Sequence, residues 1–154
     1  MTDNNTTNEL QKIDKILYHM CQKTLWEKSI SNASAYFPPT FEQDGFFTHA
    51  TAIPDRLLAT ANHFYTSSEG EWICIALSEN ALHNVGIVTK YEAPMAVGTT
   101  ETNNEWSDQE FKCPHIYGGI PVQIPGVFLN SYPMLRDETG QFLGIFGLVD
   151  SHTP

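Results

Sequence analysis

The chain has 154 residues, of which 41% are hydrophobic, and its formal net charge is −10, from 18 acidic and 8 basic side chains. A chain of this size predicts one domain around a single core. An acidic surface disfavours nucleic-acid and membrane partners over a broad face, although one arginine and a few backbone N–H groups can still bind a small anion.

The beginning of the chain and its cysteines predict where the protein works. Residues 1–12 start with the polar run MTDNNTTNEL, which predicts a flexible tail before a single globular domain at 13–154. The three cysteines, Cys21, Cys74 and Cys113, show no disulfide framework, and the polar start lacks the apolar core of a signal peptide. We therefore expect a cytoplasmic protein.

The first predicted elements are a strand and a short helix. Residues 15–20, KILYHM, have the composition of a strand. Thr24 and Glu27 have the spacing of a capping box, which predicts that a short helix begins there. Trp26 and Ile30 are four residues apart and are expected on one buried helical face.

A connector, a strand and a second helix follow. Residues 36–39, YFPP, cannot lie inside a helix, because proline lacks the N–H that a helix needs. Residues 46–51, FFTHAT, predict a strand that Gly45 opens. Pro54 suits the first turn of a helix, and the apolar spacing over 55–65 predicts a helix packed on a sheet.

The middle of the chain predicts a central strand. Residues 71–77, EWICIAL, are apolar on both faces, as in a strand buried on two sides. Residues 78–86 predict a helical turn that ends at a glycine, and residues 87–92, IVTKYE, predict another strand. The polar, acidic segment 93–111 is long enough to be a mobile excursion or to line a site.

The last third of the chain predicts mainly strands. In CPHIYGGIP, His115 is expected in a turn bounded by proline and glycine. Two strands, 126–136 and 141–149, should follow, with the turn 137–140 between them. The succession of strands predicts an α+β fold with a mixed or antiparallel sheet. A parallel βαβ unit in the first half of the chain is the alternative.

Three histidines are candidate site residues because each stands where a predicted element ends. They are His19, His49 and His115. A neutral imidazole offers one donor and one acceptor, which suits ribose hydroxyls, an amide or proton transfer near neutral pH. The alternative for each is a half-buried histidine that hydrogen bonds to a backbone carbonyl.

Other chemistries have weaker support in the sequence. His19 with Cys21, and Cys113 with His115, place an imidazole near a sulfur, but the usual zinc spacings are absent, so no metal site is expected. Either cysteine could act as a nucleophile beside its histidine. No glycine-rich phosphate loop occurs. Glu92 ends an apolar strand and is a better candidate for a site than the acids of the polar excursion.

Several motifs together resemble domain-of-unknown-function family 952. In this chain they are ILYHM, then GFFTHAT followed by a helix with ANHFY, then IVTKYE, and finally PHIYGGIP. The corresponding family motifs are approximately YHI, then GFIHCS or GFIHLST followed by a helix that ends in RFY or RFF, then WE, and finally FPHLYGPLP. The resemblance covers residues 16–127. It implies an ADP-ribosylation-like α+β fold, in which a bent mixed or antiparallel sheet is split around a cleft and carries two or three helices.

The same resemblance implies roles for individual residues. In ADP-ribosyltransferase-like folds, a histidine on the first core strand holds a ribose of NAD, a role that would belong to His19. His49 and Thr51 would seat the nicotinamide side, and Glu92 would be the nearest equivalent of the catalytic glutamate. The other implied ligand-binding residues are Arg56, His115, Tyr117 and Gly118.

The sequence also departs from the implied pattern. Glu92 does not match the glutamate of the polymerases and toxins closely, and the arginine pair of the RNA 2′-phosphotransferases is absent, because Arg56 is the only arginine near the site. We therefore expect a cleft for a nucleotide or another ribose-containing small molecule, with NAD as a candidate substrate and no established cofactor. A non-catalytic metabolite- or peptide-binding module is the alternative, and a metal-dependent hydrolase is a third interpretation.

Overall fold

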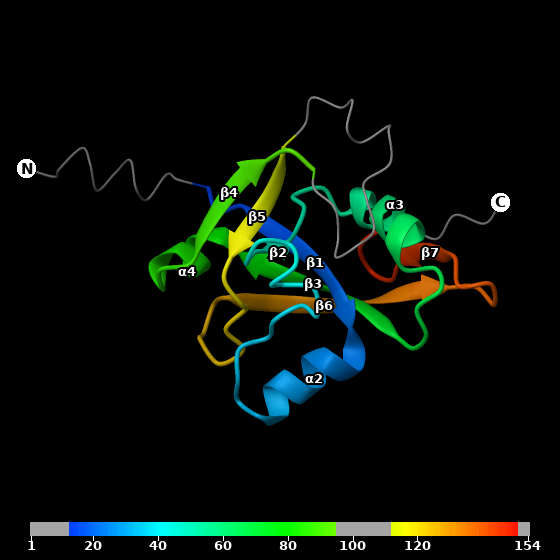
Figure 1. The fold of residues 1–154 in the computed structure, drawn as a ribbon, viewed down its shortest axis with the longest axis horizontal. Coiled ribbons are helices and arrows are strands. Elements are labelled where there is room, and N and C mark those ends of the chain that lie inside the picture. The colour runs from blue at the N-terminus through cyan, green and yellow to red at the C-terminus, as the bar shows by residue number, and fades with distance from the viewer. Residues whose placement is uncertain (1–12, 95–111, 151–154) are drawn as a thin grey trace, which may run out of the picture.

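The computed structural model describes residues 13–94 and 112–150. Within them, two antiparallel sheets and three helices form an α+β fold, as the sequence predicted (Figure 1). The predicted tail 1–12 and most of the polar excursion, residues 95–111, lie outside the described residues.

The larger sheet has four strands in the order β1-β3-β6-β7. These are β1 (Ile16–Gln22), β3 (Trp72–Ser78), β6 (Phe128–Arg136) and β7 (Phe142–Ile145). Every residue of β3 is buried, which confirms the prediction of a central strand apolar on both faces. The alternative of a parallel βαβ unit is wrong, because every strand pairing in the described residues is antiparallel.

The smaller sheet has three strands in the order β2-β5-β4. These are β2 (Thr48–His49), β5 (Cys113–Tyr117) and β4 (Val88–Glu92). His115 therefore lies in a strand, and the prediction of a turn around it is wrong. β2 and β4 pair on the two sides of β5 and hold it extended despite Pro114.

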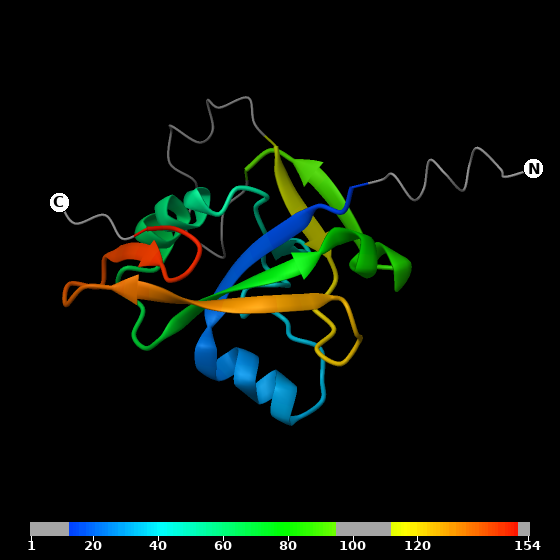
Figure 2. The same ribbon diagram turned by 180° about the vertical axis from the view of Figure 1, so that it is seen from behind.

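The two sheets meet at the short segment 48–51. Thr48 and His49 pair with β5, whereas Thr51 exchanges two backbone hydrogen bonds with Tyr18 of β1, at 2.8 and 2.9 Å. The predicted strand 46–51 is therefore shorter than expected, because its residues divide their pairing between two sheets. Beyond this junction β1 continues with β3 on one side, and the two sheets diverge, as both views show (Figure 2).

The first helix, α2 (Lys23–Ser31), follows β1 directly. The predicted capping box is wrong: the helix begins before Thr24, and its N-cap residue Gln22 makes no side-chain cap bond. The end of β1 sets this start, because Lys23 N–H donates to the carbonyl of Glu71, at 3.0 Å. Trp26 is buried as predicted, but Ile30 is 49% exposed.

Helix α3 (Asp55–Phe64) and helix α4 (Glu79–Asn84) agree more closely with the prediction. Pro54 is the N-cap residue of α3 rather than part of its first turn. Leu57 and Ala61 of α3 are buried and pack in one core cluster with residues of β1, β3 and β7. A second core cluster contains side chains on the other face of β1 and β3, such as Leu17 and Ile75.

The turn before β7 gives a prediction about stability. Gly140 has a φ of +94°, and a Cβ there would lie 2.1 Å from the carbonyl oxygen of Thr66, whereas Gly126 has a φ of +88° and open space around it. We expect Gly126→Ala to cost about 1–2 kcal/mol of unfolding free energy from backbone strain alone. Gly140→Ala should cost about 1–3 kcal/mol more, because the new methyl group must displace backbone atoms.

Chemical denaturation of the two variants measures this difference. Equal losses of stability in both would contradict the close approach of Gly140 to Thr66.

Candidate functional site

A pocket of about 630 Å³ lies along the outer edge of β1. Most of its wall comes from β1, segment 36–51, α3, β5 and the first residue of β3, and Leu25, Tyr65, Ser68 and Pro94 complete it. Five of the predicted site residues line it: His19, His49, Thr51, Arg56 and His115. Glu92, Tyr117 and Gly118 are not among the lining residues. The three histidines, which are distant in sequence, therefore share one cavity.

The sheet register explains why His49 and His115 are neighbours. They are directly opposite each other in the β2–β5 pair, so their side chains extend from the same face. Their ring centroids are 5.5 Å apart in an edge-on arrangement. The His115 ring also stacks on the buried ring of Phe47, with centroids 4.0 Å apart. Phe47 thus fixes the plane of the His115 imidazole.

His19 is 6% exposed, and one of its nitrogens is held by the backbone. Nδ1 lies 2.5 Å from the carbonyl oxygen of His49. A carbonyl can only accept, so Nδ1 carries the proton and donates. Burial lowers the pKa of His19 to about 4, and the ring is neutral at pH 7. Its other nitrogen, Nε2, is then an acceptor; it is buried and has no hydrogen-bond partner within the described residues.

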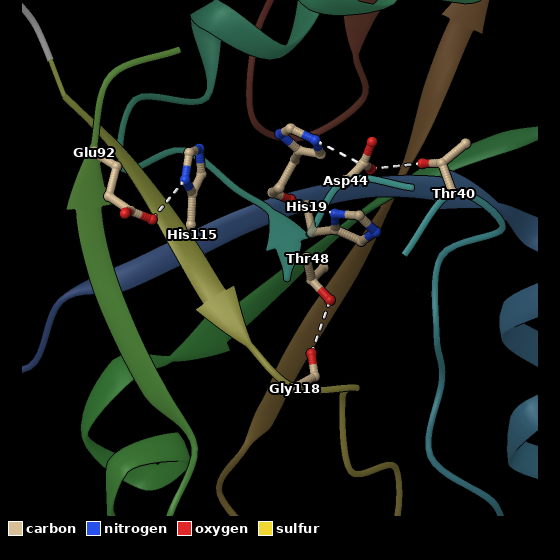
Figure 3. Close-up of polar contacts among 8 residues, drawn as sticks. His19, Thr40, Asp44, Thr48, Glu92, His115 and Gly118 are labelled. Carbon is tan, nitrogen blue, oxygen red and sulfur yellow. Dashed lines mark hydrogen bonds and ion pairs between the residues drawn. The ribbon is translucent and has the colours of Figure 1, made fainter. Parts of the chain in front are cut away.

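His115 is 1% exposed and is held in the same way by a carboxylate (Figure 3). Its Nδ1 lies 3.0 Å from Oε1 of Glu92, which also accepts a 2.5 Å hydrogen bond from the Tyr117 hydroxyl. These two hydrogen bonds, from Tyr117 and then from His115, lower the pKa of Glu92 and keep it ionised. Burial lowers the pKa of His115, although Glu92 opposes that shift.

The hydrogen bond to Glu92 determines which nitrogen of His115 can act in the pocket. Because Nδ1 is protonated and faces Glu92, Nε2 on the other side of the neutral ring is an acceptor. This atom is buried and has no hydrogen-bond partner in residues 13–94 and 112–150. Glu92 and Tyr117 therefore influence the pocket through His115 rather than by lining it.

His49 has a carboxylate neighbour that sequence reasoning missed. Its Nε2 lies 3.1 Å from Oδ2 of Asp44, at an ion-pair distance but outside hydrogen-bond geometry. Asp44 is 5% exposed and accepts a 2.6 Å hydrogen bond from the Thr40 hydroxyl. The available signal was an acidic residue beside Gly45, immediately before an apolar segment that contains a histidine.

The remaining predicted residues have varied positions. The Thr51 hydroxyl forms a local turn with Ile53, donating to its carbonyl at 3.2 Å and accepting from its N–H at 3.1 Å. The Gly118 carbonyl accepts a 2.9 Å hydrogen bond from the buried Thr48 hydroxyl, which is a structural role. Burial raises the pKa of the Cys113 thiol, and the positive charge of the nearby Arg56 opposes this rise.

The structure also bears on the metal and nucleophile interpretations. The described residues contain no group of three or more histidine, cysteine, aspartate or glutamate side chains placed to hold a metal ion. Burial raises the pKa of Cys21 and of Cys113, which disfavours the reactive thiolate of either residue. The pocket is therefore lined mainly by neutral hydrogen-bonding groups and apolar walls.

The comparisons with known proteins place the chain in a family. Residues 20–125 match the family model described as "Protein of unknown function (DUF952)". The chain belongs to this family. Among solved structures, it is similar to the X-ray crystal structure of protein CC0527 from Caulobacter crescentus, with 14% identity and a TM-score of 0.57. The match covers 82% of this chain and 92% of that one, and a double mutant of CC0527 matches equally well.

These similarities support the predicted family and a shared fold. The search of curated proteins found no match. In the described part of this DUF952 protein, no helix is long and apolar enough to cross a membrane.

The lowered pKa of His19 predicts how the stability of this DUF952 protein depends on pH. The unfolded chain binds a proton at His19 near pH 6.5, and the folded chain only near pH 4. Stability from the neutral buried ring is therefore complete above about pH 6.5 and is lost as the pH falls toward 4. Between pH 7 and 4.5 we expect a loss of about 2–3 kcal/mol from His19 alone.

The matched variant is His19→Asn, which retains an N–H donor for the His49 carbonyl but does not titrate. Urea denaturation of both proteins at the two pH values isolates the contribution of His19. Parallel pH dependence in the two proteins would show that His19 is not buried in its neutral form.

Glu92 gives a second prediction, about the charge state of His115. The carboxylate favours the imidazolium form, so Glu92→Gln should lower the pKa of His115 further. An NMR pH titration of the His115 ring measures the shift. The control is Glu71→Gln, because Glu71 pairs with Lys23 at 3.5 Å and is not among the pocket-lining residues. An unchanged or raised pKa in Glu92→Gln would refute the contact.

Proposed function

We propose that the pocket binds NAD or a related ribonucleotide, and that the fold is ADP-ribosyltransferase-like, with ADP-ribosyl transfer as the candidate activity. The observation that carries this proposal is the pair of buried imidazoles, His19 and His115, in the wall of one pocket. Each has its Nδ1 proton held by the protein and a second nitrogen without a partner among the described residues. Ribose hydroxyls are donors that suit such acceptors.

The outer edge of β1 provides backbone groups that can form hydrogen bonds with an amide group of the ligand. The backbone N–H and C=O of Tyr18 face outward and bond to Thr51. Alternate residues of a strand turn these groups to the same side, so those of Met20 also face outward, beyond the junction with Thr51. Met20 lines the pocket. A carboxamide, such as that of nicotinamide, can pair with a free strand edge through one donor and one acceptor.

Arg56 supports binding of the anionic part of a nucleotide. It is the pocket-lining arginine, and a guanidinium binds phosphate oxygens through paired N–H donors. This contact suits a small anion inside a protein whose net charge is −10. The ligand class that fits these groups is a small nucleotide, and we do not expect a nucleic-acid or membrane partner. The three free cysteines agree with a cytoplasmic, reducing setting.

Transfer of an ADP-ribosyl group requires stabilisation of the positive charge that develops on the ribose as the bond to nicotinamide breaks. Two carboxylates stand behind the imidazoles of the pocket, Glu92 behind His115 and Asp44 behind His49. Each can stabilise a charge in the pocket electrostatically, through the ring that it contacts. In this scheme Glu92 acts as a positioning residue for His115.

The hydrogen bonds that Glu92 accepts also favour a second candidate function. One carboxylate oxygen accepts hydrogen bonds from both Tyr117 and His115, and Glu92 is not among the pocket-lining residues. A pocket whose described lining residues include no carboxylate suits a non-catalytic binding module for the same class of ligand. Release of nicotinamide from NAD separates the two candidates, because only a transferase or hydrolase produces it.

Calorimetry and thermal unfolding with NAD, ADP-ribose, nicotinamide and inorganic phosphate test the proposal. At one hundred times its dissociation constant, a specific ligand should add about 2.7 kcal/mol of stability, which is several degrees for a domain of this size. His19→Ala and His49→Ala should weaken binding of NAD. His83→Ala is the control, because His83 is exposed on α4 and is not among the residues that line the pocket.

The proposal is wrong if none of the nucleotides raises the unfolding temperature. It is also wrong if both pocket variants bind NAD as tightly as the wild-type protein does.

A further inference from the structure

Trp72 contains a buried hydrogen-bond donor for which the described chain provides no acceptor. The residue begins β3 and is 7% exposed. Its indole Nε1 is buried and has no hydrogen-bond partner in the described residues. An indole N–H can only donate, and buried tryptophan nitrogens usually find a partner. An unsatisfied buried donor of this kind calls for an explanation, and a ligand is one.

Trp72 lies in the wall of the same pocket, among neutral side chains. It is opposite Gln22 in the β1–β3 register, and the Gln22 amide donates to the Ser68 hydroxyl at 3.3 Å. The ring of Tyr65 lies 4.5 Å from that of Trp72, between centroids, and Leu57 completes the apolar side of the wall. Aromatic and aliphatic walls with a few polar groups are typical of sites for flat ligands.

The position of Trp72 differs from that of the histidine end of the pocket. His19 is opposite Ile75, three residues from Trp72 along β3, which corresponds to about 10 Å. Side chains alternate between the two faces along a strand, so Trp72 and Ile75 extend from opposite faces of the sheet. His19 extends from the same face as its partner Ile75, and therefore from the face opposite to that of Trp72. Both line one pocket, to which β1, an edge strand of the larger sheet, contributes side chains from its two faces, His19 from one and Met20 and Gln22 from the other. The pocket therefore has an end with acceptors, at His19, and an end with a donor, at Trp72.

We propose that Trp72 Nε1–H is a ligand-binding donor that recognises an uncharged acceptor, a carbonyl oxygen or a ring nitrogen, on a flat heterocycle beside Tyr65 and Leu57. The inference rests on the proposed function, because the histidine end would hold the sugar of the same ligand. The side chains named at this end carry no charge that could pair with an ion, which would lose its hydration there. Burial and, less strongly, the nearby Asp44 carboxylate raise the pKa of Tyr65, and this carboxylate disfavours an anion. A neutral acceptor therefore suits this end. Trp72 would thus select the ring of the ligand rather than its sugar or phosphate.

The wild-type protein allows a direct test by NMR. It has three tryptophans, so sequential assignment gives three indole N–H signals. The probes are NAD, nicotinamide, adenosine, ribose and inorganic phosphate. We expect NAD and at least one of nicotinamide and adenosine to move the Trp72 signal downfield, whereas ribose and phosphate leave it in place. The inference is overturned if no probe moves the Trp72 signal more than that of Trp26, which is buried but does not line the pocket.

A pair of variants provides the second readout. Trp72→Phe keeps a flat ring and removes the N–H, and it should weaken the affinity for the probe that moves the indole signal by about 5- to 150-fold. Trp26→Phe is the matched control and should leave that affinity unchanged. Equal weakening in both variants, or no weakening in Trp72→Phe, overturns the inference. If Trp72→Phe does not fold, the wild-type NMR measurement decides the question.

The outcomes separate this inference from the proposed function. If adenosine or nicotinamide moves the Trp72 signal while NAD does not bind, the donor subsite stands and the proposed NAD site fails. If NAD binds and the Trp72 signal does not move, the proposed function stands and the donor subsite fails.

Discussion

The hydrogen bond from His19 to the carbonyl of His49 is the constraint on which the site depends. Segment 48–51 pairs with β5 at its start and with β1 at its end, so the two sheets separate around it. Where the two sheets separate, His19 of the larger sheet donates to the backbone carbonyl of His49, which belongs to the smaller sheet. The same bond fixes the tautomer of His19 and leaves its Nε2 as an acceptor. Sheet geometry and site chemistry therefore share one contact.

The sequence predicted the elements well where a single local rule decides the structure. The apolar run of β3 and the helical spacing of α3 are examples, because burial on two faces or on one stripe produces those patterns. The errors come from tertiary context. The Thr24 capping box does not form, because the pairing of β1 ends at Gln22 and α2 starts directly after it. His115 is in a strand because two partners, which no local pattern announces, pair with β5.

The same distinction applies to the site. The sequence indicated His19, His49 and His115 because each is a polar residue at the end of an apolar segment, and the structure brings them to one pocket. Its signal for Asp44 was weak, because Asp44 belongs to an irregular segment and reaches His49 only through the folded path of the chain. It also presented Trp72 as an ordinary core residue, because an unsatisfied N–H is visible only when the surrounding acceptors have been placed.

The stacking of His115 on Phe47 has a consequence for the entropy of binding. Phe47 is fully buried, and its ring lies nearly parallel to the imidazole, with an interplanar angle of 18°. With Glu92 bonded at one edge as well, the imidazole is restricted to one rotamer before any molecule arrives. A partner that binds there does not have to freeze this side chain, so little of its interaction energy is lost in ordering the protein. Rigidity of this kind is established when the chain folds.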